Sequence, residues 1–293
     1  MRRLSTLVTM VILVGLAVGK DALDELNILV NNLRNSSYEV ERFVQESGIV
    51  TTARNERVVK SGPYKLVTSY SSLRGEFGWV RNSSGQFAIY RDKDIAFEPL
   101  INIKDYEDNL IDLVNSRSFK VTLFLDLPNS MKIILVSGNL TFEIVYDDSY
   151  RLIKLVKSYP FHTISASYRN YNDLSGASLS GLTNATNGMI IIRPPLYLSE
   201  AIMEEIYSWS SMDFATDGRA YLYTVLMYSS QYGRMVLYFS FNSEPENLQK
   251  FSIQMAESNG FSYALKRISN SSALSLLGMV DSKTLAAILD QLY

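Results

Sequence analysis

The chain has 293 residues, of which 47% are hydrophobic, and a formal net charge of −2 at pH 7. No block of Lys and Arg provides the basic patch that nucleic-acid binding requires, so we expect a globular protein with no nucleic-acid partner. The chain contains no Cys and a single His, His162, which leaves almost nothing for ordinary zinc, haem or iron–sulfur sites. We therefore expect no metal site and no cofactor.

The N-terminus predicts export. Arg2 and Arg3 precede an apolar run that ends at Val18, and Ala17 and Gly19 are small residues at the positions that a signal peptidase reads. This run is shorter than the roughly 20 residues that cross a bilayer comfortably. We expect residues 1–19 to be a signal peptide cleaved near Gly19, which leaves a periplasmic or secreted chain. The alternative is an uncleaved N-terminal helix that anchors the chain in a membrane.

The first half of the remaining chain predicts a helix followed by antiparallel strands. Asp21 can cap a helix, and Leu26, Val30 and Leu33 recur on one face of it. From Tyr38 the apolar period changes to two, which is typical of a strand. Further strands are expected over residues 49–60, 64–70, 77–81 and 86–90.

A second helix is predicted over residues 105–114, because its first turn is acidic and suits the helix dipole. Strands follow over residues 119–125, 131–136, 141–146, 150–157 and 162–168. The next segment, 173–188, is rich in Ser, Gly, Asn and Thr and has few apolar residues, which predicts a linker or a long surface loop.

The C-terminal part has its own alternation of helices and strands. Helices are predicted over residues 199–209, 246–257 and 282–292, and strands over residues 220–228, 234–241, 261–268 and 273–280. We therefore expect a first domain over residues 20–172, a linker over residues 173–189 and a smaller C-terminal α+β domain over residues 190–293.

Catalytic signatures are scarce. His162 lies in a strand pattern, and the sequence contains no Gly-x-Ser-x-Gly elbow, no Walker loop and no Gly-x-Gly-x-x-Gly. Carboxylates are numerous, so a carboxylate-dependent secreted hydrolase remains an alternative. Its signature would be two buried carboxyl groups facing each other across a cleft. This scarcity of catalytic motifs favours a protein that is not an enzyme.

The order of elements resembles the lipoprotein-carrier (LolA/LolB-like) superfamily of the bacterial periplasm. The resemblance rests on residues 62–66, which enter a strand, and on residues 78–80. In the C-terminal part, residues 232–238, 259–261 and 274–280, followed by a terminal helix, resemble the MucB/RseB family of periplasmic regulators.

This resemblance implies a curved antiparallel sheet that forms an unclosed barrel around helices, with a smaller C-terminal α+β domain. It also implies a non-enzymatic binding protein whose partner is an acyl chain or lipoprotein, or a membrane-anchored regulatory protein such as an anti-sigma factor. A diffusible periplasmic lipoprotein or lipid carrier is the alternative on the same fold.

The side chains that would line an apolar hollow are large apolar residues of the predicted strands. We expect them to be Phe77, Trp79, Phe87, Phe97, Phe124, Leu135 and Ile144. Alternation along a strand shows which residues share a face, but it leaves open which face is hollow and whether these residues are ordinary core.

Overall fold

The computed structural model describes most of the chain after the N-terminal segment. The described residues are 21–47, 51–72, 75–99, 102–160, 162–193, 205–214, 220–229, 233–242, 253–258, 260–269 and 272–292. The predicted signal peptide and its cleavage site lie outside these residues.

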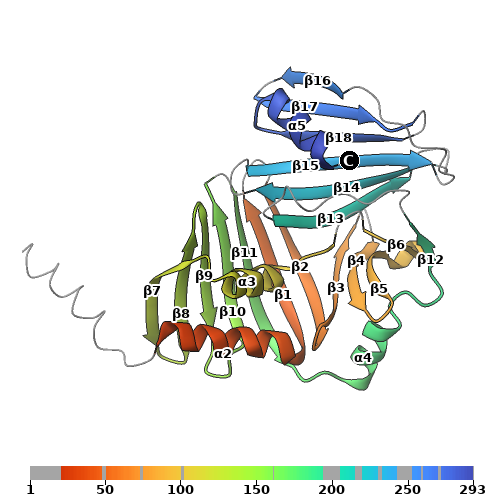
Figure 1. Cartoon of the computed structure of the whole chain (residues 1–293). Coiled ribbons are helices and arrows are strands. Elements are labelled where there is room, and N and C mark those ends of the chain that lie inside the picture. Colours follow the sequence, from red (N-terminus) through yellow and green to blue (C-terminus); the bar gives the residue numbers. More distant parts are fainter. Residues whose placement is uncertain are drawn as a thin grey trace, which may run out of the picture.

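The first sheet is large, curved and unclosed. Its strands are Ser37–Ser47 (β1), Thr52–Ser61 (β2), Tyr64–Ser71 (β3), Gly75–Asn82 (β4), Gly85–Tyr90 (β5), Ile95–Phe97 (β6), Lys120–Leu127 (β7), Ser130–Ser137 (β8), Leu140–Tyr146 (β9), Leu152–Tyr159 (β10), His162–Asn172 (β11) and Ile190–Ile192 (β12). They form one twelve-stranded sheet in the order β12-β6-β5-β4-β3-β2-β1-β11-β10-β9-β8-β7. Neighbours are antiparallel except β12 and β6. Figure 1 shows the two edges of this sheet far apart.

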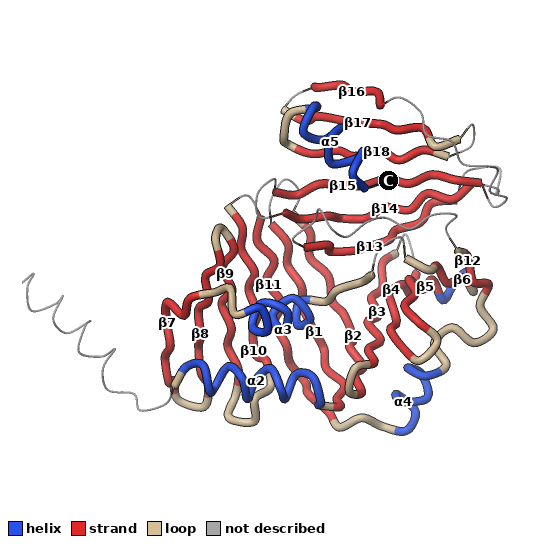
Figure 2. Tube along the Cα trace, in the orientation of Figure 1, coloured by secondary structure: helices blue, strands red, loops and turns tan. Residues whose placement is uncertain are grey.

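Two helices lie within the curve of the sheet, on the side that we call its inner face (Figure 2). Helix α2 covers Ala22–Asn35 and begins at Asp21, whose side chain accepts a hydrogen bond from the backbone of Leu23. Helix α3 covers Tyr106–Ser116 and begins with a capping box formed by Asp105 and Asp108. Both helices were expected from the sequence at nearly these bounds.

The inner face and the two helices share one apolar core, which we call the inner-face core. Helix α2 contributes Leu26, Leu29, Val30 and Leu33, and α3 contributes Leu110 and Val114. The strands contribute residues that alternate along β1, β8, β9 and β10, as the period of two predicts. The expected α+β class with a curved, unclosed antiparallel sheet is therefore confirmed.

The segment after β11 is not the surface loop that its composition predicts. It contains helix α4, Gly176–Thr183, which is capped by Ser175 and buries Leu182. Leu182 and Ala185 pack against residues of β2–β6 on the outer face of the sheet, opposite α2 and α3. The loop prediction was wrong because one or two apolar residues are enough to hold a short helix against a sheet face that already exists. The domain boundary over residues 173–189 remains a prediction.

A second, smaller sheet follows. Its strands are Glu205–Phe214 (β13), Ala220–Ser229 (β14), Gly233–Asn242 (β15), Ile253–Ser258 (β16), Phe261–Arg267 (β17) and Ala273–Gly278 (β18). They are ordered β13-β14-β15-β18-β17-β16. Helix α5, Ser282–Leu292, packs on this sheet through its buried residues Leu285, Ile288, Leu289 and Leu292.

Two predicted helices of this part are corrected. The first, over residues 199–209, overlaps β13, which pairs with β14; residues 199–204 lie outside the described residues. The second, over residues 246–257, overlaps β16, which pairs with β17; residues 246–252 lie outside the described residues. Short apolar runs do not distinguish a helix from a strand, and pairing with distant strands decides between them.

Candidate binding site

The structure divides the seven predicted lining residues among three apolar clusters. Trp79, Leu135 and Ile144 belong to the inner-face core, and the partly buried Phe124 packs against it. Trp79 is 7% exposed, and Leu135 and Ile144 are fully buried. In this structure α2 and α3 cover the inner face over these residues, so a ligand can reach them only if a helix moves.

The other three predicted lining residues lie elsewhere. Phe77 and Phe97 pack with side chains of the second sheet and α5, in a cluster that joins the two sheets. Phe87 faces the opposite side of the first sheet and packs with α4. Phe87 pairs with Val80 and not with Trp79 across the β4–β5 ladder, so Phe87 and Trp79 do not share a surface. Whether any of these residues touches a ligand remains a prediction.

Five charged residues meet under the N-terminus of α3, and we call them the charged cluster. They are Arg42, Glu56, Lys65, Asp105 and Glu107, and all are nearly or fully buried. Arg42 Nη1 lies 2.8 Å from Asp105 Oδ2, and Lys65 Nζ lies 2.9 Å from the same oxygen. Arg42 also contacts Glu56, with 2.7 Å between Nη2 and Oε2, and Lys65 contacts Glu107.

These ion pairs fix the charge of Asp105. Burial alone raises the pKa of Asp105, but attraction by Arg42 and Lys65 outweighs it and holds the pKa below its usual range. The same carboxylates raise the pKa of Lys65 against the effect of its burial. Asp105 therefore stays ionised. A general acid in a hydrolase needs a raised carboxyl pKa, so Asp105 does not fit the role that the hydrolase alternative requires.

Sequence reasoning missed this cluster, although a signal was present. Tyr38, Val40, Arg42 and Val44 alternate on one face of β1, so the pattern places Arg42 among apolar residues. A charge on a buried face needs a partner, because an unpaired buried charge costs several kcal/mol. One partner, Glu56, lies directly opposite Arg42 on β2, and the other, Asp105, caps α3 at a sequence distance that no local pattern reveals.

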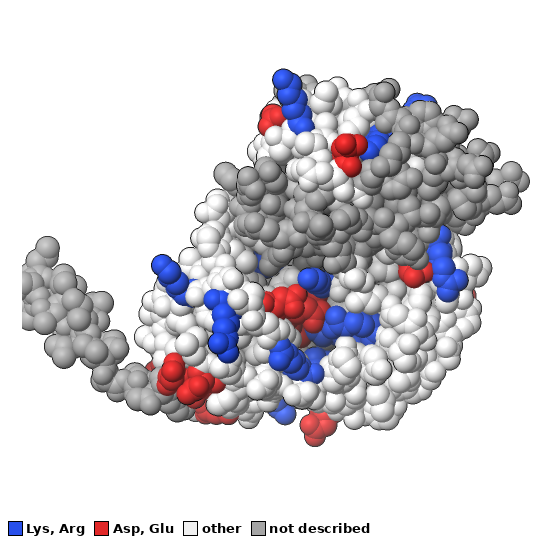
Figure 3. Space-filling view, in the orientation of Figure 1, with Lys and Arg blue, Asp and Glu red and all other residues white. Residues whose placement is uncertain are grey.

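An open groove runs beside the C-terminal end of α2, and we call it the α2 groove. It has a volume of about 540 Å³ and is lined by Leu33, Arg34, Asn35, Lys60, Gly62, Pro63, Tyr64, Arg81, Asp108 and Ile111. Leu33 belongs to the inner-face core and Ile111 packs against it, so the groove lies next to that core. Figure 3 shows basic side chains around an acidic patch on this face of the first sheet.

The α2 groove is lined by three cationic side chains, Arg34, Lys60 and Arg81, and by one carboxylate, Asp108. Arg81 holds Asp108 with two hydrogen bonds of 3.0 and 3.1 Å. Lys60 forms no ion pair with a carboxylate of the described residues; its ammonium donates to the backbone carbonyls of Arg34, Ser36 and Gly62 at 2.7 to 3.2 Å. Burial and the nearby charge of Lys65 lower the pKa of Lys60 to about 8. The groove thus has an apolar floor and a net positive rim.

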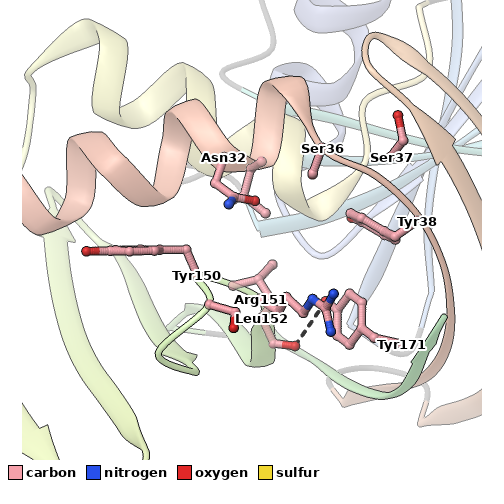
Figure 4. A pocket seen from close by; sticks show the side chains of 10 residues that line it. Asn32, Ser36, Ser37, Tyr38, Tyr150, Arg151, Leu152 and Tyr171 are labelled. Atoms are coloured by element: carbon pink, nitrogen blue, oxygen red, sulfur yellow. Dashed lines mark hydrogen bonds between the residues drawn. The ribbon is translucent and has the colours of Figure 1, made fainter. Parts of the chain in front are cut away.

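A smaller cavity lies on the other side of α2, and we call it the tyrosine pocket. It has a volume of about 190 Å³ and is lined by Asn32, Leu33, Ser36, Ser37, Tyr38, Ser149, Tyr150, Arg151, Leu152 and Tyr171. Figure 4 shows Tyr38 and Tyr150 at opposite ends of it, with Asn32 on the α2 side.

Comparison with known proteins gives similarity in structure but not in sequence. No family model matches the chain, and no curated protein sequence matches it. The structure is similar to that of MucB, with a TM-score of 0.43 and 8% identity over 94% of this chain and 97% of that chain. It is similar to the Pseudomonas aeruginosa MucA/MucB complex, with a TM-score of 0.42 and 12% identity over 91% of this chain and 97% of that chain. A crystal structure of LprF from Mycobacterium bovis gives a TM-score of 0.33 and 8% identity over 51% and 92% of the two chains.

Among the described residues, no helix has both the length and the apolar character needed to cross a membrane. Within the same residues, no group of three or more His, Asp or Glu side chains is arranged to hold a metal ion.

Proposed function

We propose that this chain is an exported, non-enzymatic binding protein that takes an apolar chain with an acidic group beside it, such as the acyl chain of an anionic lipid or of a lipoprotein, at the α2 groove. The observation that carries the proposal is the groove itself, which has apolar surface next to the inner-face core and is lined by the cations Arg34, Lys60 and Arg81. Its volume of about 540 Å³ lies within the roughly 300–1,000 Å³ typical of ligand pockets.

The groove offers matching chemistry to both the apolar chain and the acidic head group of an amphiphile. Leu33 and Ile111 offer apolar surface in the groove, and an apolar chain that lies on it displaces water from both surfaces. Arg34 is exposed where an acidic head group would remain, and it is not paired with a carboxylate of a described residue. Lys60 adds positive charge nearby, although its three N–H groups already donate to backbone carbonyls. The sequence resemblance also implies a second kind of partner, a membrane-anchored regulatory protein. Such a protein would have to present an apolar segment with an acidic group to the α2 groove.

The experiment measures binding of dodecanoate to the mature chain. Trp209→Phe leaves Trp79 as the single Trp, and Trp79 belongs to the core that the groove adjoins. We expect a saturable change in Trp79 fluorescence and a dissociation constant from it. Ile111→Gln places a polar amide in the groove and should weaken binding about tenfold or more.

Ile153→Gln is the matched control, because Ile153 is an exposed isoleucine of β10 that does not line the groove. It should leave the dissociation constant unchanged. If dodecanoate does not perturb Trp79 and does not bind by calorimetry, or if the two variants bind it equally well, the proposed site is wrong.

A further inference from the structure

The tyrosine pocket differs from the α2 groove in size and chemistry. Its volume of about 190 Å³ is below the roughly 300 Å³ where drug-sized ligand sites begin, so it admits one small ring rather than a chain. It is lined by the continuous segment from the last turn of α2 into the start of β1, by the turn between β9 and β10, and by Tyr171 of β11, which are three regions far apart in the sequence (Figure 4).

Three tyrosine rings in the wall are held in place by their own hydroxyl groups. Tyr150 donates to Glu25 Oε2 at 3.1 Å, and Tyr171 donates to the carbonyl of Leu152 at 3.1 Å. Tyr38 donates to Glu107 Oε2 at 3.3 Å, and its ring meets that of Tyr171 edge to face at 5.2 Å. Because the hydroxyl groups are engaged elsewhere, the rings offer mainly carbon surface to the pocket, in positions set before any ligand arrives.

The turn that supplies Tyr150 has an unusual backbone. Tyr150 has φ of +56°, a left-handed conformation that is rare for aromatic residues and that Gly or Asn adopts more easily. Asp147 holds this turn, since its Oδ1 accepts the backbone N–H groups of Ser149 and Arg151 at 2.9 and 2.8 Å. The turn thus keeps a large ring at the pocket at some cost in backbone energy.

The polar groups of the pocket restrict the chemistry of a ligand. Its lining includes the amide of Asn32, the hydroxyl of Ser36 and the guanidinium of Arg151, but no Asp or Glu. Ser36 Oγ is buried and has no hydrogen-bond partner among the described residues. Arg151 lies over the Tyr171 ring at 5.5 Å and forms no ion pair with any carboxylate that the structure describes.

These groups exclude two ligand classes and fit a third. An amine would find no carboxylate in the lining, and a phosphate would find one cation where such groups usually meet several. Amide and hydroxyl side chains both donate and accept hydrogen bonds, which matches a ligand whose hydroxyl groups do the same. Carbon surface at both ends of the pocket suits the C–H faces of a saturated ring.

We propose that the tyrosine pocket binds one neutral sugar ring, as a free monosaccharide or as the terminal residue of a glycan. The proposal is independent of the α2 groove, because apart from Leu33 the two sites have no lining residue in common. The sugar would lie between Tyr38 and Tyr150, with its hydroxyl groups directed to Asn32, Ser36 and Arg151.

The test is saturation-transfer NMR on the mature chain with glucose, galactose, mannose and N-acetylglucosamine, each as the free sugar and as its methyl glycoside. We expect transfer to at least one sugar and a measurable dissociation constant. Binding of the methyl glycoside as well identifies a terminal glycan residue as an acceptable ligand, and binding of only the free sugar identifies the monosaccharide.

Two variants test the site. Asn32→Ala removes the amide at a helical position where Ala is favourable, and Arg151→Gln removes the cation; each should weaken binding by about fivefold to tenfold. Asn31→Ala is the control, because Asn31 is the exposed neighbour on α2 and does not line the pocket. Absence of transfer to every sugar overturns the proposal. Binding that Asn32→Ala and Arg151→Gln leave unchanged overturns it as well.

Discussion

Arg42 on β1 and Asp105 at the N-cap of α3 form a buried ion pair, with 2.8 Å between Nη1 and Oδ2 and about 1% of each side chain exposed. Asp105 also caps α3 by accepting a hydrogen bond from the backbone of Tyr106. One carboxylate therefore fixes where the helix begins and where it docks on the inner face. The α2 groove depends on this docking, because α3 contributes Asp108 and Ile111 to it.

Removing the charge of Asp105 should destabilise the first sheet and the two helices packed on it. Asp105→Asn leaves Arg42 and Lys65 buried with one anion fewer, and loss of one partner of a buried pair costs about 3–5 kcal/mol. The free energy of unfolding in urea measures the loss. Asp112→Asn, on the exposed side of α3, is the control and should change it by less than about 1 kcal/mol. Equal effects of the two substitutions would contradict the role of the charged cluster.

Acid should lower the free energy of unfolding by protonating Asp105. The pKa of Asp105 is lower in the folded chain than in the unfolded chain, so its contribution to stability is complete above about pH 4 and is lost as the pH falls toward the folded value. The free energy of unfolding should fall steeply below about pH 4 in the wild type and less steeply in Asp105→Asn. Parallel curves for the two proteins would show that other carboxylates dominate.

Lys60 should make the free energy of unfolding rise with pH a second time, in base. Its pKa is lowered to about 8 in the folded chain, chiefly by burial, while the ordinary value is 10.5. Between these values the unfolded chain binds more protons, so the contribution of Lys60 to stability rises with pH from about 8 to 10.5. Lys60→Met keeps the apolar stem and should make this part of the pH profile flatter. A profile that Lys60→Met does not change would mean that Lys60 titrates normally.

Helix α4 offers a test with an internal control. Leu182 is fully buried against the outer face of the first sheet, whereas Leu179 on the same helix is 42% exposed. Leu182→Asp should detach α4 and make residues 173–189 the first site of limited proteolysis, while Leu179→Asp should leave the cleavage pattern as in the wild type. Early cleavage within this segment in the wild type would restore the interpretation of an exposed linker.

The strands and helices of the first domain could be predicted because their periods are local. The change from a helical repeat at Leu33 to alternation at Tyr38 marks the α2–β1 boundary within a few residues. The inner and outer faces of the sheet could not be assigned from the sequence. Alternation places Val80 and Trp79 on opposite faces but does not show which of them packs against the helices. The charged cluster and both cavities depend on contacts between segments that are distant in sequence, such as Lys65 with Asp105.

The predicted signal peptide should be cleaved on export. Helix α2 begins at Ala22, and its cap is the side chain of Asp21, so cleavage after Gly19 would leave the cap and the whole helix in the mature chain. N-terminal sequencing of exported material should therefore begin at Lys20. Asp21→Ala should lower the free energy of unfolding of that mature chain by about 1 kcal/mol, because the first turn of α2 loses its side-chain acceptor. Recovery of the intact N-terminus from membranes would show instead that the first residues act as an anchor.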